Sequence, residues 1–98
     1  MNVLSEPEIQ NRLKSLEGWR VSKEGIHKQY HLADFRSSLK LVNRVADLAE
    51  EANHHPDILV SYDKVTFTLI THDAGGITEK DFDLACRIEG AAARSEER

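Results

Sequence analysis

The sequence contains a single cysteine, Cys86, among its 98 residues. One cysteine excludes an internal disulfide framework and a zinc site built from several thiolates. Cys86 falls in a segment with helical periodicity, where we expect a small, buried side chain. Apolar stretches near the ~20 residues needed to cross a bilayer are also missing. The first six residues lack the basic and apolar regions of a signal peptide, so we expect a cytoplasmic protein without a membrane partner.

An excess of positive charge is absent as well. Lysine and arginine number 13 against 17 aspartates and glutamates, which gives a formal net charge of −4 at pH 7. Because binding to a nucleic acid depends on neutralising phosphates, this balance disfavours a general nucleic-acid-binding surface. Hydrophobic residues make up 40% of the chain and charged residues 31%, which is typical of a globular domain. We find no linker, repeat or low-complexity tract, so we expect one domain over residues 1–98.

Three segments begin with a capping pattern, in which a polar side chain accepts a hydrogen bond from the first turn of a helix. The longest of the three helices is expected to run from Asp34 to about Ala52, because Pro56 prevents its continuation. The capping residues of the other two expected helices are Ser5 with Glu8, and Thr78 with Asp81.

The second helix carries an apolar stripe at spacings of three and four residues, which we expect to face the core. The stripe narrows from large side chains to alanines, which would let the C-terminal half of the helix pack closely against a sheet. Leu41 and Leu48 lie off this stripe and are expected to offer a surface for a partner or a second copy. The stripe consists of Phe35, Leu39, Val42, Val45 or Ala46, and Ala49.

Four short segments have the composition of β-strands. Two of them flank a two-residue loop at Tyr62-Asp63, and the hairpin register then places Val60 opposite Val65. The order of elements is α-β-β-α-β-β-α, an α+β fold with a four-stranded antiparallel sheet and the helices packed on one face. Such a small sheet has unpaired edges, so we expect a homodimer. The expected strands are residues 19–22, 26–32, 58–60 and 65–71.

Three of the five histidines, His54, His55 and His72, are expected to converge. The hairpin register brings His72 to the open end of the hairpin, beside the other two. Glu50 lies four residues before His54, on the same face of the second helix if that helix continues. Asp81 lies in the first turn of the third helix, which begins soon after His72. A contact between an imidazole and a carboxylate would fix the tautomer and raise the pKa of the imidazole.

The residues alone leave three interpretations of this cluster open. Three imidazoles can hold zinc, but His54 and His55 would point to opposite faces of an extended chain, and the spacing lacks the His-x-x-x-His pattern of a helical zinc site. A purely structural role is the second interpretation, since a histidine near a helix C-terminus interacts well with the helix dipole. The third is acid–base chemistry without a cofactor, which supports proton transfer in a dehydration, an isomerisation or a tautomerisation.

The same residues carry a resemblance that covers nearly the whole chain. From about Leu48 to Ile88 the sequence resembles the pterin-4a-carbinolamine dehydratase family almost without a gap, and Gly18-Trp19 fits the family too. A His-His-Pro motif with a downstream Thr-His-Asp is specific at this spacing. The matching motifs are Glu50-x-x-x-His54-His55-Pro56-Asp57, Tyr62-x-Lys64-Val65 and Thr71-His72-Asp73-Ala74-Gly75-Gly76-Ile77-Thr78-Glu79-Lys80-Asp81.

The resemblance implies a hydro-lyase that uses no cofactor. Members of the family remove water from a 4a-hydroxytetrahydropterin and give the quinonoid dihydropterin, which returns the pterin cofactor of aromatic amino acid hydroxylases to use. They form dimers or tetramers, which adds a homotetramer to the expected assemblies. We expect His54 and His72 to transfer the protons, without deciding which is the acid, and His55 to orient the pterin. The resemblance implies His54, His55 and His72 as catalytic residues, Glu50, Asp81, Asp73 and Pro56 as supporting residues, and no metal.

Two other functions stay open within this resemblance. Some family members also serve as dimerisation cofactors of a transcription factor, so the chain could be a binding module whose second helix contacts the partner. The substrate could also be a different pterin, for example one from folate or molybdenum-cofactor metabolism, because the sequence does not identify the side chain at pterin C6.

Overall fold

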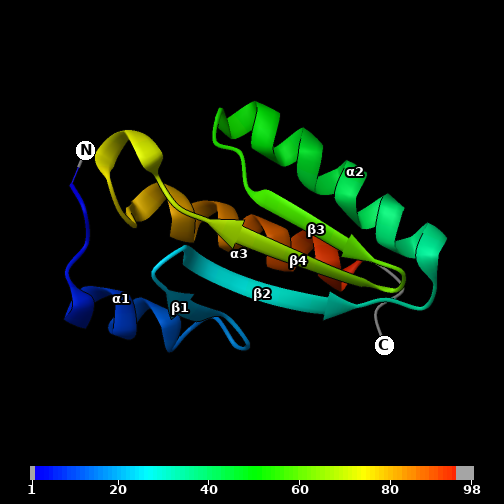
Figure 1. Cartoon of the computed structure of the whole chain (residues 1–98), viewed down its shortest axis with the longest axis horizontal. Helices are drawn as coiled ribbons and strands as arrows, with labels where there is room; N and C mark the ends of the chain where they lie inside the picture. Colours follow the sequence, from blue (N-terminus) through cyan, green and yellow to red (C-terminus); the bar gives the residue numbers. More distant parts are fainter. Residues whose placement is uncertain (1, 95–98) are drawn as a thin grey trace.

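The computed structural model describes residues 2–94. Its helices and strands follow the predicted order, and the α+β fold is confirmed (Figure 1). The elements are α1 (Glu6–Leu13), β1 (Arg20–Ser22), β2 (Gly25–His31), α2 (Phe35–Ala52), β3 (Asp57–Ser61), β4 (Lys64–Leu69), the short 3-10 helix η1 (His72–Ala74) and α3 (Glu79–Ala93).

The predicted capping residues begin all three α-helices. The Ser5 side chain accepts from the backbone N–H of Glu8, whose carboxylate accepts from Ser5 in return. The Asp34 side chain accepts from the backbone N–H of Ser37 at the start of α2. Thr78 and Asp81 form the corresponding box at the start of α3. Each cap satisfies a backbone donor that the helix leaves unpaired, so the helix starts are determined locally.

The four strands form one antiparallel sheet in the order β1-β2-β4-β3. Val60 pairs with Val65 and Ile58 pairs with Phe67, which confirms the predicted register of the second hairpin. Tyr62 takes a left-handed conformation in the turn, with φ of 55°. A one-residue slip would reverse the face of every side chain, so this register also determines what lies beyond the open end of the hairpin.

The helices cover one face of this sheet. Along β4, Val65, Phe67 and Leu69 are buried while the residues between them are partly exposed. Figure 1 shows α3 behind the sheet, and α2 packs on α3 and reaches β3 and β4. Trp19 and Phe82 also belong to this core. Within residues 2–94, no helix combines the length and the apolar character needed to cross a membrane.

Glu89 of α3 connects the helix layer to β2 and to Trp19, the residue before β1. Its carboxylate accepts hydrogen bonds from the Trp19 indole N–H at 3.0 Å, from the Lys28 ammonium at 2.8 Å and from the Tyr30 hydroxyl. Burial raises the pKa of Glu89, but these hydrogen bonds outweigh it and hold the pKa below its usual range. The carboxylate is therefore ionised at neutral pH, and the three hydrogen bonds to its Oε2 stabilise the packing of α3 on the sheet.

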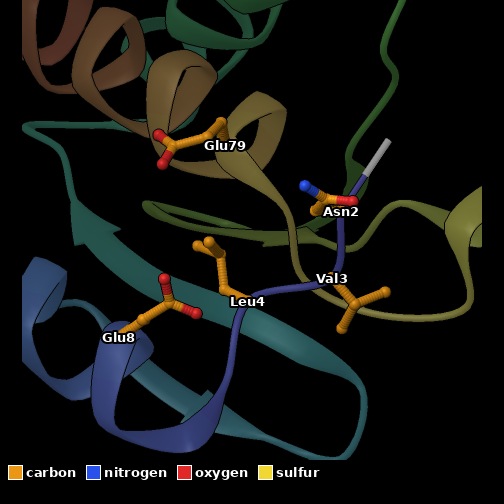
Figure 2. Close-up of a pocket in the computed structure, with 5 residues that line it drawn as sticks. All are labelled: Asn2, Val3, Leu4, Glu8 and Glu79. Carbon is orange, nitrogen blue, oxygen red and sulfur yellow. The ribbon is translucent and has the colours of Figure 1, made fainter.

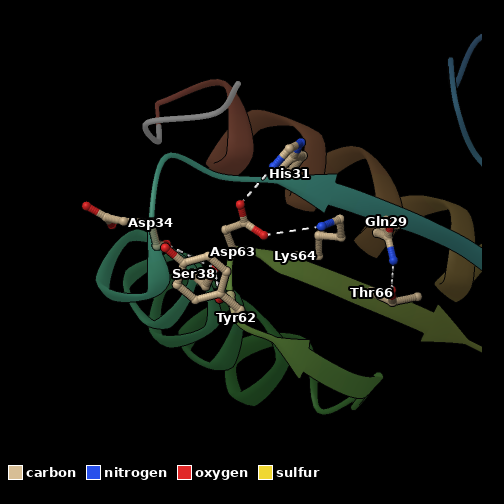
Figure 3. Close-up of polar contacts among 8 residues, drawn as sticks. All are labelled: Gln29, His31, Asp34, Ser38, Tyr62, Asp63, Lys64 and Thr66. Atoms are coloured by element: carbon tan, nitrogen blue, oxygen red, sulfur yellow. Dashed lines mark hydrogen bonds and ion pairs between the residues drawn. The ribbon is translucent and has the colours of Figure 1, made fainter.

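The predicted core stripe of α2 is confirmed in its C-terminal half and wrong in its N-terminal half. Val45 and Ala49 are buried, whereas Phe35 and Leu39 are 49% and 40% exposed. Leu41, which was expected to offer a surface for a partner, is wholly buried instead. The helix carries two apolar stripes, each with the i, i+4 spacing, and periodicity alone does not indicate which of them faces the sheet. The buried Ser38 hydroxyl, which donates to the Tyr62 carbonyl at 2.9 Å, fixes the rotation of the helix (Figure 3).

Cys86 was expected to be buried and is exposed instead. The core face of α3 is formed by Phe82, Ala85 and Ile88. Cys86 follows Ala85 directly, and each residue of an α-helix turns the chain by about 100°, which carries its thiol off the buried face.

Candidate active site

A hollow of about 240 Å³ collects all three histidines of the predicted cluster. They reach it from two segments, the chain after α2 and the loop after β4, as the hairpin register predicted. The residues that line it are Asn53, His54, His55, Ile70, Thr71, His72, Asp73 and Lys80.

The C-terminal end of α2 sends His54 and His55 in different directions. Asn53 takes the left-handed conformation, with φ of 52°, and closes the helix with N–H bonds to the carbonyls of Ala49 and Glu50. Asparagine is one of the few residues that adopt this conformation readily at a helix end. The chain then becomes extended before Pro56, and the result is a buried His54 beside an exposed His55.

Asp81 anchors His54 from the start of α3. One carboxylate oxygen of Asp81 lies 2.5 Å from Nε2 of His54. The other accepts from the Thr71 hydroxyl at 3.0 Å and from the Thr78 backbone N–H at 2.9 Å. Asp81 has no exposed surface. An ionised Asp81 requires the proton on Nε2 of His54, and in the neutral ring Nδ1 is then the basic nitrogen.

Glu50 contacts His55, at 2.6 Å from Nε2, and not His54 as the sequence suggested. The prediction assumed that the helix continues to residue 54, but it ends at Ala52 and the left-handed Asn53 redirects the chain. Both Glu50 and His55 are exposed, so solvent screens this pair and its contribution to stability is small.

His72 lies on η1, lines the same hollow and is exposed. Within the described part of the chain its imidazole has no hydrogen-bond partner, which leaves both ring nitrogens available to a ligand. The loop that carries it is closed at its base, where the Thr71 N–H donates to the Gly76 carbonyl at 3.0 Å. Gly75 takes φ of 79° and allows the tight return of the chain.

The N-terminal segment braces this loop from outside. The Leu4 N–H donates to the Ile77 carbonyl at 2.8 Å. Val3 lies so close to Gly76 that a Cβ on the glycine would be 2.8 Å from a Val3 methyl group. Figure 2 shows this segment passing the start of α3, where its residues line a separate hollow of about 610 Å³ with Glu8 and Glu79.

Of the two remaining predicted site residues, Asp73 and Pro56, only one lines the hollow. Asp73 lines the hollow, whereas Pro56 is not among the lining residues and instead begins the passage into β3. Four residues line the hollow that the sequence did not predict as site residues, namely Asn53, Ile70, Thr71 and Lys80. The alternation of β4 continues to Thr71, which would have placed its side chain inside, but the position of Lys80 depends on how α3 packs and had no sequence signal.

In residues 2–94 no group of three or more His, Cys, Asp or Glu side chains is arranged to hold a metal. Nε2 of His54 and Nε2 of His55 each face a carboxylate of the protein. These contacts favour orientation of the rings for proton transfer.

Comparison with known proteins decides the family. The model of the pterin 4 alpha carbinolamine dehydratase family matches residues 2–91. The chain belongs to this family. Pterin carbinolamine dehydratases are hydro-lyases, and membership places the protein in that enzyme class.

Individual relatives of this dehydratase family are similar over almost their full length. A protein of Herpetosiphon aurantiacus that carries the name pterin-4-alpha-carbinolamine dehydratase is 51% identical to this chain. The match covers 91% of this chain and 93% of the relative's length. A protein of Koribacter versatilis with the same name is 46% identical over 87% of this chain and 90% of its own.

Two solved structures are similar in fold. A transcriptional coactivator/pterin dehydratase from Brucella melitensis has a TM-score of 0.89 and 32% identity, and the match covers 93% of this chain and 99% of that one. A pterin dehydratase-like protein described as a RuBisCO assembly factor in the alpha-carboxysome has a TM-score of 0.62 and covers 76% of this chain and 86% of that one. At 21% identity the second likeness shows the fold alone.

Proposed function

We propose that this protein dehydrates a 4a-hydroxytetrahydropterin to the quinonoid dihydropterin and so recycles the pterin cofactor of aromatic amino acid hydroxylases. The observation that carries the proposal is the pair His54 and His72, two imidazoles from different segments that line one small hollow. One is held by a buried carboxylate and the other is exposed to solvent. Such a pair can divide the two proton transfers of a dehydration.

The reaction needs one acid and one base. The C4a–O bond breaks and the hydroxyl leaves as water once it receives a proton, while N5 loses its proton and forms a double bond to C4a. We assign the base to Nδ1 of His54, because Asp81 holds Nε2 and stabilises the imidazolium that forms, as the aspartate does in a catalytic triad. We assign the acid to His72, because its exposed ring exchanges protons with water between turnovers.

The supporting residues follow from the same contacts. His55, oriented by Glu50, would bind the polar edge of the pterin ring, with Asp73 on the rim of the hollow. Pro56 would fix the backbone that separates the directions of His54 and His55. An exposed single cysteine fits a reducing compartment, so we place the reaction in the cytoplasm.

The test is a dehydratase assay with matched variants. The 4a-hydroxytetrahydropterin is generated in situ near neutral pH, with a chelator present, and its ultraviolet decay is followed. We expect His54→Ala and His72→Ala each to slow the decay by ~10²-fold or more. His31→Ala is the control, because His31 lies at the far end of β2 from the hollow. Folded protein without any acceleration, or full activity in both site variants, would overturn the proposal.

We also propose that the protein forms a homodimer or homotetramer. Strand β3 is an edge of the sheet, and an edge presents unpaired backbone groups that a second copy can pair. Phe35 and Leu39 of α2, which contacts β3, and Ile58 of β3 are exposed apolar side chains. Burial of this surface against a second copy would remove it from water.

A further inference from the structure

A second hollow of about 340 Å³ also borders His54 and is lined by residues at the end of α2 and in the first turns of α3. It shares His54 and Lys80 with the histidine hollow, so the two spaces adjoin at these two side chains. A molecule bound among the histidines can therefore extend past His54 without leaving the protein surface. The lining residues of the second hollow are Ala52, His54, Lys80, Asp83, Leu84 and Arg87.

The two cationic side chains that line the second hollow differ in whether they already form an ion pair within the protein. The Arg87 guanidinium is paired with Glu51 of α2. The Lys80 ammonium forms no ion pair or hydrogen bond with any side chain in the described part of the chain, and it is exposed. Asp83 is the one carboxylate among the lining residues. Lys80 therefore supplies a positive charge where the two hollows adjoin, and this charge is not paired with a carboxylate in the described part of the chain.

The chemistry of the pterin ring indicates what would occupy this space. The substituent of a pterin is carried by C6, and C6 is bonded to N5, the atom that loses its proton in the dehydration. When N5 and C4a lie between His54 and His72, the substituent is attached at C6, only two bonds from the reacting carbon C4a. It must then leave the histidine hollow close to His54, where the second hollow begins.

We propose that the second hollow binds the C6 substituent of the pterin and that Lys80 makes the enzyme prefer substituents that carry a carboxylate or a phosphate. This inference rests on the proposed dehydratase function. Leu84 and Ala52 supply an apolar wall for the carbon chain of the substituent, and Lys80 supplies the charge for its anionic end. Asp83 opposes that charge and limits the preference.

The kinetic test compares three 4a-hydroxytetrahydropterins, with a methyl, a neutral dihydroxypropyl or a carboxylate-bearing group at C6. We expect kcat/KM to favour the anionic substrate by about fivefold, the range of a partly exposed ion pair. Lys80→Ala should remove the preference by raising KM for the anionic substrate relative to the two neutral substrates, and Lys80→Arg should keep it. Asp83→Asn should increase it. Lys40→Ala is the matched control, because Lys40 is an exposed lysine of α2 that lines neither hollow.

A direct binding measurement tests the proposed subsite independently of the dehydration reaction. Calorimetric titration with stable 7,8-dihydropterins of the same three kinds requires no turnover, and a phosphate-ester member shows whether phosphate or carboxylate is preferred. A Lys80-dependent preference in binding without turnover would support the subsite and contradict the dehydratase proposal. Turnover with equal KM values, unaffected by Lys80→Ala, would overturn the subsite alone. Folded protein that binds none of the three pterins would overturn both.

Discussion

Asp81 caps α3 with one carboxylate oxygen and holds His54 with the other. The start of a helix and the orientation of an imidazole therefore depend on one buried side chain. Because the Thr71 hydroxyl also donates to Asp81, the same residue connects the chain after α2, the loop after β4 and α3. A change at Asp81 acts on stability and on chemistry through different atoms, and the two effects can be separated.

Asp81→Asn should separate them. An asparagine keeps a carbonyl oxygen for the cap but lacks the charge that stabilises an imidazolium at His54, so we expect a loss of dehydratase rate of ~10²-fold or more with a modest loss of stability. Asp81→Ala should also destabilise the fold by about 2 kcal/mol or more, because buried donors lose their acceptor. Urea denaturation and the ultraviolet assay measure the two effects, with the exposed Asp83→Asn as the stability control. Equal rates in wild type and Asp81→Asn would contradict the role of the carboxylate.

The sequence predicted those features of the fold that depend on local pattern. Caps at Ser5, Asp34 and Thr78 and the register of Val60 with Val65 are determined within a few residues, and all are observed. The convergence of the histidines followed from the register alone, since antiparallel pairing fixes which residues meet at the open end of a hairpin.

The features that failed depend on packing between distant elements. Phe35, Leu39 and Leu41 of α2 were misassigned because the helix carries two apolar stripes, and only the docking of Leu41 against the core distinguishes them. The partner of Glu50 was misassigned because Asn53 reverses the chain in one residue. Lys80 reaches the hollow only because α3 packs beside the end of α2, which no local pattern indicates.

Replacement of two glycines by alanine should change the stability of the protein in opposite directions. Gly25 begins β2 with φ of 129°, and a Cβ there would lie 2.1 Å from the Leu69 carbonyl oxygen. Because that oxygen belongs to the backbone of β4, which leads into the His72 loop, we expect Gly25→Ala to destabilise the protein severely and to lower its expression as folded protein. Gly90 lies within α3 and a Cβ there meets nothing within 4 Å.

Gly90→Ala should therefore stabilise the protein, by about 0.5–1 kcal/mol, since alanine has the higher helix propensity. Thermal denaturation of both variants measures the difference. A Gly25→Ala variant as stable as the wild type would contradict the close approach of β2 and β4 at this position.

The exposed apolar side chains of α2 and β3 predict the behaviour of the protein in solution. Phe35→Glu and Ile58→Lys should each lower the mass measured by sedimentation equilibrium, because they place a charge in the proposed contact between copies. Phe35 is 49% exposed and Ile58 is 37% exposed, so the melting temperature at low protein concentration should change little. Arg36→Glu, an exposed neighbour of Phe35, is the control. A wild-type protein that sediments as a monomer at all concentrations tested would contradict self-association.

The far end of the sheet from the histidine hollow should be sensitive to acid. His31 lies 2.9 Å from Asp63, and this hydrogen bond, together with the Lys64 ammonium at 3.3 Å, holds the pKa of Asp63 below its usual range despite burial (Figure 3). A lowered pKa in the folded state adds stability above the unfolded-state pKa of about 3.9, and this stability is lost as the pH falls through the folded value. We expect His31→Ala to raise the Asp63 pKa in a carboxyl carbon NMR titration and to flatten the loss of stability below about pH 4. His27→Ala, on the same face of β2 but paired with Thr68, should change neither, and an unaltered Asp63 titration in His31→Ala would show that His31 does not hold the carboxylate in solution.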